Sequence, residues 1–253
     1  MNRLTAVDLH DGLAVETVVY PYGTVCISSQ AGCRMACPFC ASGRKGLVRS
    51  LTAEEMLLQV ETAPSAKRVT VSGIGEPLDN FDEVARFIAL CPLPVSVTTT
   101  ASSTELLKKL LLLPHNGVMI SIHGGTEDAH KKLVPKAPPL IEIYSALASA
   151  WEQMSVRARK RVGLNYLPVA GINDSEEEIE LFAQAALKFP ESSVHLLSLN
   201  KVPNSPFQPV SHARRDEIFQ LLRGQGINVR RANAFRRQEK GGCGTLWLKK
   251  YID

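Results

Sequence analysis

The chain has 253 residues, of which 45% are hydrophobic and 21% are charged, an ordinary composition for a globular protein. No apolar run approaches the roughly 18 residues that a membrane-spanning helix needs, and residues 1–7 lack the basic-then-apolar pattern of a secretory signal. The formal charge of +4 is uneven, because from residue 201 onward 11 Lys and Arg face 4 Asp and Glu. Such a basic region indicates either a polyanionic partner, such as nucleic acid, or a solvated basic surface.

The N-terminal segment is predicted to form a β-hairpin, since Leu4–Leu9 and Ala14–Tyr20 flank Asp11-Gly12, a dipeptide that supplies the positive φ of a tight turn. After it, short β-rich runs alternate with amphipathic helical runs. The expected strands are Thr24–Ser28, Arg68–Val71, Val95–Thr98, Val118–Ile122, Val162–Leu167, Val194–Leu199 and Ile227–Arg230. The expected helices are Leu51–Thr62, Asn80–Leu90, Ser102–Leu113, a short segment ending near Leu133, Leu140–Met154, Ser175–Phe189 and Val210–Gly224.

This alternation predicts an α/β fold, a partial (β/α)6 barrel of the TIM type with a parallel sheet inside and helices outside. We expect residues 24–253 to form one core and residues 1–23 to form a hairpin appendage. In such folds the functional residues lie at the C-terminal ends of the strands, so side chains at those ends are the candidates.

Three of the six cysteines, Cys33, Cys37 and Cys40, fall within eight residues. In a chain without a visible signal peptide this clustering indicates metal binding and not a disulfide framework. Three thiolates on one loop can each bind one iron of a [4Fe–4S] cluster and leave the fourth iron open. The alternative is a structural zinc site, which would need a fourth Cys or His nearby, and residues 41–90 contain neither.

An open iron can be chelated by the amine and carboxylate of S-adenosylmethionine (SAM), and an electron from the cluster then breaks a carbon–sulfur bond to give a 5′-deoxyadenosyl radical. The loop Gly73–Pro77 follows a predicted strand; its glycines let a ligand approach the backbone, and its glutamate can hold an ammonium group. Thr98, Ser121 and His123 end later strands and could bond the carboxylate or ribose of SAM. Each is more often structural when taken alone, but beside the cysteine loop they indicate a SAM site.

The chain resembles the radical SAM methyl synthases that methylate an adenine of large-subunit ribosomal RNA, some of which also act on transfer RNA. The matching stretches run nearly the whole length, in the order and spacing of that family. They are residues 15–18, 26–33, the cysteine loop, 46–52, 75–80, 121–123, 171–174, 199–200 and 242–244.

The resemblance assigns roles by position. It makes Cys33, Cys37 and Cys40 the ligands of the [4Fe–4S] cluster. The positions that contact SAM are Gly75, Glu76, Thr98, Ser121, Ile122, His123 and Asn200. The catalytic positions are Cys243, which is methylated first, Cys26, the second catalytic cysteine, and Glu16, an acidic active-site residue.

The resemblance also implies why two cysteines are needed, since carbon 2 or carbon 8 of adenine is electron-poor and cannot attack the SAM methyl directly. Cys243 would take the methyl from one SAM, and the radical from a second SAM would remove a hydrogen from that S-methyl group. The resulting radical would add to the adenine carbon. Cys26 would then act as the base, and a Cys26–Cys243 disulfide would release the product.

More ordinary interpretations stand beside these roles. A cysteine in a strand, such as Cys26, is most often a small buried packing residue. Cys243 in a Gly-rich segment could be an inert surface thiol, and Glu16 in a hairpin strand is usually a solvated side chain. Cys91 matches no functional position, and we interpret it as packing or as a loop thiol without a role.

We expect this chain to lack the N-terminal accessory domain with which the family helps to grip RNA. Ahead of Cys243 the family has an acidic stretch, whereas residues 235–241 here are more basic. A set of basic residues could partly supply the grip on RNA. That set is Arg230, Arg231, Arg236, Arg237, Lys240, Lys249 and Lys250.

The expected partners are ribosomal or transfer RNA and an electron donor such as flavodoxin or ferredoxin. The expected compartment is the cytoplasm, because an exposed iron–sulfur cluster survives poorly outside reducing surroundings. Two alternatives remain. One is a radical SAM enzyme of the same core that modifies a peptide or small molecule; the other is a non-catalytic RNA-binding protein with a structural metal.

Overall fold

The main sheet carries the fold in the computed structural model, which describes residues 1–238 and 241–247. Its nine described strands lie in the order β1-β2-β3-β6-β7-β8-β9-β10-β11. Their bounds are β1 Arg3–Asp8, β2 Ala14–Tyr20, β3 Thr24–Ile27, β6 Arg68–Val71, β7 Val95–Thr99, β8 Gly117–Ser121, β9 Val162–Tyr166, β10 Ser193–Leu196 and β11 Val229–Arg231. The pairings β1–β2 and β2–β3 are antiparallel, and every pairing from β3 to β11 is parallel.

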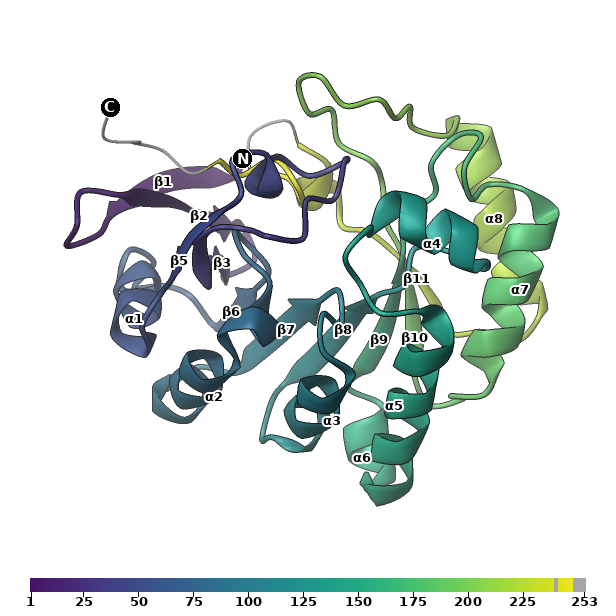
Figure 1. Ribbon diagram of the computed structural model, residues 1–253, viewed down its shortest axis with the longest axis horizontal. Coiled ribbons are helices and arrows are strands. Elements are labelled where there is room, and N and C mark those ends of the chain that lie inside the picture. The colour runs from purple at the N-terminus through teal and green to yellow at the C-terminus, as the bar shows by residue number, and fades with distance from the viewer. Residues whose placement is uncertain (239–240, 248–253) are drawn as a thin grey trace.

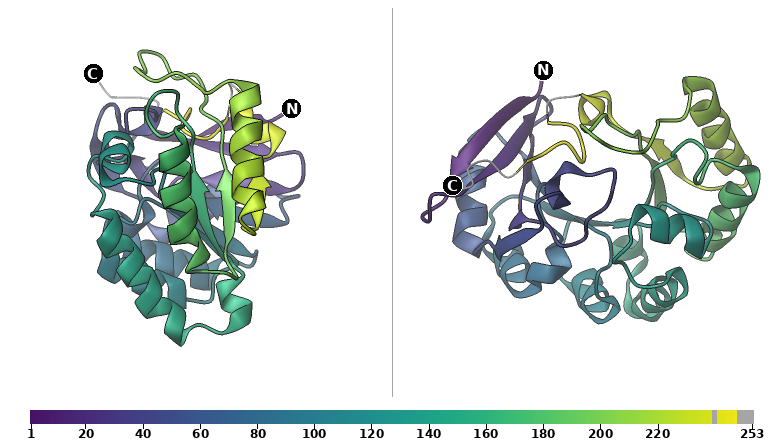
Figure 2. Two further views of the ribbon diagram at one scale, coloured as in Figure 1. Left: turned by 90° about the vertical axis from the view of Figure 1, so that its right-hand side faces the viewer. Right: turned by 45° about the horizontal axis from the view of Figure 1, so that its top comes forward.

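Helices cover the outer side of this sheet, as Figure 1 shows. The longer helices are α1 Ala53–Glu61, α2 Phe81–Leu90, α3 Thr104–Leu112, α5 Leu140–Gln153, α7 Glu176–Leu187 and α8 His212–Gly224. The shorter ones are α4 Glu127–Leu133, α6 Val156–Arg159 and the 3-10 turns η1 Ala41–Gly43, η2 Pro77–Asn80 and η3 Ala234–Arg237. In both views of Figure 2 the helices follow the curvature of the sheet, and the loops gather on its concave side.

The predicted α/β fold is confirmed, and the sheet is open: among the described residues β1 pairs only with β2, and β11 only with β10. Its parallel strands are buried on both faces, which is why they read as nearly continuous apolar runs. All five residues of β9, for example, are buried. The N-terminal hairpin continues the sheet through β2 and shares its core, to which Val7, Val15 and Val18 belong.

Local capping signals explain where the helices begin. Thr52 and Glu55 form a capping box at α1. At α3 the cap is Ser103, whereas the hydroxyl of the preceding Ser102 donates to Asp79 at 2.7 Å.

One small element was not predicted. β4, Gln30–Gly32, pairs antiparallel with β5, Leu47–Ser50, and this ribbon frames the cysteine loop. Among the described residues no helix is long and apolar enough to cross a membrane.

Candidate active site

The cysteine loop follows β4 and is held by backbone contacts. Gly32 has a φ of +85°, and a Cβ there would collide with the Gly46 carbonyl, so the close approach of these two segments requires glycine. Cys33 donates its N–H to that carbonyl at 2.9 Å, and the Cys40 N–H donates to the Cys37 carbonyl at 3.0 Å. All three thiols are free: Cys33 and Cys37 are each 8% exposed, and Cys40 is partly buried.

The three thiols lie close enough to influence one another. Burial raises the pKa of Cys33 to about 12 and raises the pKa of Cys37 well above its ordinary value, and the charge of Cys40 adds to both effects. Thiols gathered in a buried place and unpaired with carboxylates or disulfides are a soft donor set, of the kind that iron–sulfur clusters use.

The geometry fits a multi-iron cluster better than a single ion. Within residues 1–238 and 241–247, no three His, Cys, Asp or Glu side chains converge closely enough to hold one metal ion. A four-iron cluster places a separate iron before each cysteine, so its ligand sulfurs surround a body of atoms and do not meet at a point. The loop packs with Leu133, Val134, Leu167 and Val169, an apolar lining that excludes water from such a cluster.

The Gly75-Glu76 segment lies beside the cysteine loop. Arg34 of the loop makes a bidentate ion pair with Asp79, at 2.5 and 2.7 Å, and so joins the two segments. Gly75 has a φ of +113°, and a Cβ there would lie 2.7 Å from the Ser29 hydroxyl oxygen, so only glycine is accommodated.

Glu76 is 2% exposed, and its carboxylate accepts four hydrogen bonds from the protein itself. One oxygen accepts from the Thr99 hydroxyl and from the Leu78 N–H, and the other accepts from the N–H and hydroxyl of Thr100. Burial raises its pKa, and these hydrogen bonds oppose that effect. With four acceptor positions in use, Glu76 in this geometry orders its loop, and an ammonium group would have to replace one of these donors.

The remaining candidates lie at or just after the C-terminal ends of β7 and β8. Thr98 is partly buried on β7, and Ser121 and Ile122 are buried at the end of β8. His123 has a φ of +57°, its Nδ1 lies 3.0 Å from the Asn165 carbonyl, and its ring meets Phe39 of the cysteine loop edge-on at 5.6 Å. Because a carbonyl only accepts, His123 carries its proton on Nδ1, and burial lowers its pKa to about 3.

Cys26 lies in β3 and is 3% exposed. Its sulfur lies 3.3 Å from the Ser72 hydroxyl oxygen, which lies 3.1 Å from that of Thr70. Burial raises the pKa of Cys26, and the charge of Arg236 opposes the rise. Cys26 is therefore a buried thiol, as a packing residue would be. In addition, its sulfur lies close to the Ser72 hydroxyl and is influenced by the charge of Arg236.

The loop that carries Cys243 is docked over the cysteine loop. The Ala41 N–H donates to the Gly244 carbonyl at 2.8 Å, and the Ser42 hydroxyl donates to the Leu246 carbonyl at 3.0 Å. The Asn200 side-chain amide donates to the carbonyls of Arg236 and Cys243, each at 2.9 Å. In this geometry Asn200 fastens the Cys243 loop.

Two residues of β2 hold the same loop from the other side. The Tyr20 hydroxyl donates to the Gly241 carbonyl at 3.1 Å, and Glu16, 3% exposed, accepts from the Trp247 N–H at 2.7 Å. Glu16 is therefore a buried, hydrogen-bonded side chain and not the solvated one that a hairpin strand usually carries at such a position.

Arg236 connects the two cysteines. A terminal nitrogen of its guanidinium lies 3.5 Å from the Cys243 sulfur, and the same group stacks over the Tyr20 ring at 5.3 Å. Its positive charge acts on both Cys26 and Cys243. The sequence showed Arg236 only as part of a basic run, and Lys240, Lys249 and Lys250 of that run lie outside the described residues.

The structure thus gathers residues that are far apart in sequence: the cluster loop, the Gly75-Glu76 loop, His123, Asn200, Cys26, Cys243 and Glu16. Reasoning from sequence missed Tyr20, Ser72 and Arg236, which surround the two cysteines. Cys91 lies elsewhere, against the core at the end of α2.

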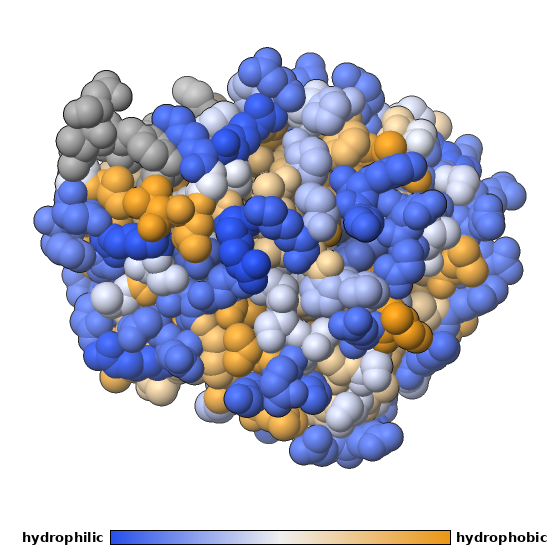
Figure 3. Space-filling view, in the orientation of Figure 1, coloured by the Kyte–Doolittle hydropathy of each residue, from blue (hydrophilic) through white to orange (hydrophobic). Residues whose placement is uncertain are grey.

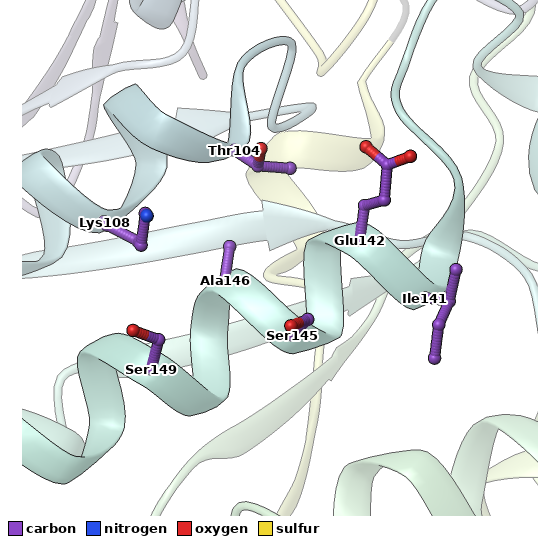
Figure 4. Close-up of a pocket in the computed structure, with 7 residues that line it drawn as sticks. All are labelled: Thr104, Lys108, Ile141, Glu142, Ser145, Ala146 and Ser149. Carbon is purple, nitrogen blue, oxygen red and sulfur yellow. The ribbon is translucent and has the colours of Figure 1, made fainter.

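A cavity of about 470 Å³ lies between α3 and α5 in the outer helix layer, away from the cysteine loop and the Gly75-Glu76 segment. Figure 4 shows Lys108 of α3 and Glu142, Ser145 and Ser149 of α5 along it. None of the predicted site residues lines it.

Comparisons with known proteins place these features in a family context. The model of the radical SAM superfamily matches residues 27–186. The chain is 31% identical over 265 residues to a probable dual-specificity RNA methyltransferase RlmN of Geobacillus kaustophilus, covering 96% of this chain and 71% of that protein. It is 34% identical over 257 residues to a probable RNA methyltransferase of Rhodopseudomonas palustris, covering 95% and 70%.

Solved structures agree with this similarity. A radical SAM methyltransferase from Sphaerobacter thermophilus is 29% identical, with a TM-score of 0.85 over 97% of this chain and 77% of that one. Streptococcus suis SuiB bound to S-adenosylmethionine shares the fold alone, with 14% identity and a TM-score of 0.64 over 85% of this chain and 51% of its own.

Proposed function

This chain belongs to the radical SAM superfamily, and from that membership we propose that it is an RNA methyltransferase that C-methylates an adenine through a methyl group carried on Cys243. Its relatives named as RNA methyltransferases support the RNA substrate, which we take to be ribosomal or transfer RNA.

One observation carries the proposal. Cys26 and Cys243 stand 217 positions apart, yet Arg236 acts on both sulfurs and the loop of Cys243 bonds directly to the loop of Cys33, Cys37 and Cys40. This proximity supports a mechanism in which a methyl carrier, a second thiol and a cluster would act together. A single buried packing cysteine would need no such arrangement.

The residues present fit the absent cofactors. Cys33, Cys37 and Cys40 would hold a [4Fe–4S] cluster. The residues that would contact SAM are Gly75, Glu76, Thr98, Ser121, Ile122, His123 and Asn200. Together the cluster and SAM would supply a transferable methyl group and the one-electron chemistry that removes hydrogen from an unactivated carbon.

The protein's own residues would do the rest. Arg236 would hold the sulfur of Cys243 in place through the contact at 3.5 Å from its guanidinium. Cys26, close to the Ser72 hydroxyl, would take the proton from the substrate carbon. After losing that proton to solvent, its thiolate would attack the Cys243 sulfur, so that the disulfide forms while the bond from that sulfur to the methylene carbon breaks, and this carbon leaves with the electron pair and takes up a proton. Tyr20 and Asn200 hold the Cys243 loop over the site while this happens. An external one-electron donor such as flavodoxin or ferredoxin would supply the reducing electron.

Mass spectrometry of the protein, purified without oxygen, tests the proposal. We expect a methyl group, or an attached RNA fragment, on the tryptic peptide that contains Cys243. Cys37→Ala should lose the visible absorbance of the reconstituted cluster, SAM cleavage and this modification together, whereas Cys91→Ala should keep all three. An unmodified Cys243 in protein that cleaves SAM would contradict the methyl-cysteine route and favour another radical SAM reaction of the same core.

A further inference from the structure

A cavity of about 250 Å³ opens beside the active site, between the segment that follows β10 and the start of α8. Its polar lining consists of Ser198, Asn200, His212, Arg215 and Arg237, and the rest of its wall is apolar. Asn200 is also the residue that fastens the Cys243 loop, so the cavity and the methyl carrier share a wall.

Arg215 faces this cavity without an anionic partner. One terminal nitrogen donates to the Ser198 hydroxyl at 2.7 Å, and the other lies 2.9 Å from Nδ1 of His212. The adjacent acid, Asp216, pairs with Arg231 at 2.5 Å. In the part of the chain that the structure describes, no carboxylate lies within ion-pair distance of Arg215 or Arg237.

The two guanidinium groups repel each other. Burial lowers the pKa of Arg215, the positive charges of Arg237 and Arg231 lower it further, and the negative charge of Asp216 raises it. Arg215 is partly buried and Arg237 is exposed, and an anion bound between their two guanidinium groups would be attracted by both charges.

The beginning of α8 adds to the positive potential. His212 is its first residue, and its first turn carries no acid. The other described helices of eight residues or more, α1, α2, α3, α5 and α7, each carry an Asp or Glu there. Acids in a first turn neutralise the positive end of the helix dipole, so at α8 this end is left to attract an external anion.

We propose that this cavity, which we call the Arg215 pocket, binds a phosphate group of the RNA backbone next to the nucleotide that is methylated. Guanidinium forks, a hydroxyl and a helix N-terminus are together the groups that recognise phosphate oxygens. The proposal rests on the proposed RNA substrate and makes it more specific, because a phosphate bound in the pocket would fix the position of the RNA strand relative to the active site. Arg236, which points inward to Cys243, takes no part in it.

The pocket is tested by RNA binding to the cluster-loaded protein under anaerobic conditions. The probe is a short fluorescein-labelled RNA hairpin with adenines in its single-stranded loop, and affinity is measured by fluorescence anisotropy over a series of salt concentrations. We expect Arg215→Gln and Arg237→Gln each to weaken binding about 3- to 10-fold and each to reduce the slope of log K against log salt by about one. Arg223→Gln is the matched control, since it removes the same charge from the far end of α8, and it should change the affinity less than about 2-fold.

A parallel measurement of SAM binding by equilibrium dialysis separates phosphate from the carboxylate of SAM as the anion. Unchanged SAM affinity in both variants supports the phosphate site. Lost SAM affinity with intact RNA binding would overturn it, as would RNA affinity and salt slopes equal to those of the unmodified protein, or no RNA binding at all. The proposed function fails separately, through the absence of a methyl group on Cys243.

Discussion

The backbone N–H of Trp247 donates to the carboxylate of Glu16 at 2.7 Å, although the two residues stand 231 positions apart. Glu16 lies on β2, at the wall of the site, and is 3% exposed. The N-terminal hairpin therefore contacts the loop of Cys243, and the sequence context of Glu16 did not reveal this contact.

The Glu16 contact leads to a first prediction. Glu16→Ala should release the Cys243 loop, raise its cleavage by limited proteolysis and lower methylation of Cys243 by about 10-fold, because a buried N–H loses its acceptor. Glu16→Gln keeps an acceptor oxygen, so it should retain most of both properties. If Glu16 acted through its charge as a base, the glutamine variant would instead be as inactive as the alanine variant while its proteolysis stayed normal.

Cys26 gives a second prediction. Cys26→Ala should stop product release and leave RNA covalently joined to the protein through Cys243, because no thiol remains to remove the proton and close the disulfide. A denaturing gel should show an RNA-dependent shift, and mass spectrometry should place the link on Cys243. The double variant Cys26→Ala/Cys243→Ala should show no shift. Normal turnover by Cys26→Ala would remove Cys26 from the mechanism.

Arg236 gives a third prediction. Arg236→Met should slow the alkylation of Cys243 by iodoacetamide at neutral pH about 3- to 10-fold, because the variant loses the cation that contacts the attacking sulfur. Arg236→Lys should recover part of this rate. Peptide mass spectrometry measures it, with Cys91 of the same molecule as the internal reference and Arg237→Met as the control of equal charge. A rate that is unchanged or higher in Arg236→Met would contradict the assigned contact.

His123 gives a prediction for pH. Its pKa is lowered to about 3 from an ordinary 6.5, so the unfolded chain binds a proton on this residue at a pH where the folded chain does not. Stability should therefore be lost as the pH falls from 6.5 toward 3, by at most about 1.4 kcal/mol per pH unit for this single group. Thermal unfolding between pH 7 and pH 5 should show a smaller decrease of the midpoint in His123→Asn than in the unmodified protein. An equal decrease in both would show that His123 does not titrate in this way.

The fold could largely be predicted from the sequence, and the proposed ligand loop could be recognised there as a motif, because both depend on local patterns. Buried parallel strands are apolar runs of a few residues, a capping box such as Thr52 and Glu55 is a spacing, and Cys33, Cys37 and Cys40 are a short motif. β5 was missed because Leu47–Ser50 is short and largely exposed, and only its pairing with β4 makes it a strand.

The inner wall of the site could not be read in this way. Tyr20 and Glu16 make contacts that span more than 200 positions, and no spacing within the sequence records such contacts. Charge patterning alone placed Arg236 among residues that would grip RNA, whereas its guanidinium points to Cys243. Glu76 shows the same limit: its position was evident, but the four hydrogen bonds that its carboxylate accepts were not.

The docking of the Cys243 loop onto earlier parts of the chain has a consequence for biosynthesis. The ribosome releases the cysteine loop and β2 long before it reaches Cys243, so the thiols that we propose to bind iron are accessible while the segment that docks on their loop is still untranslated. Under the proposed function, metal loading would precede this docking, and the proposed methyl carrier, Cys243, would be added last. We expect a nascent chain stopped before that segment to accept iron and sulfide yet to be unable to pass a methyl group onward.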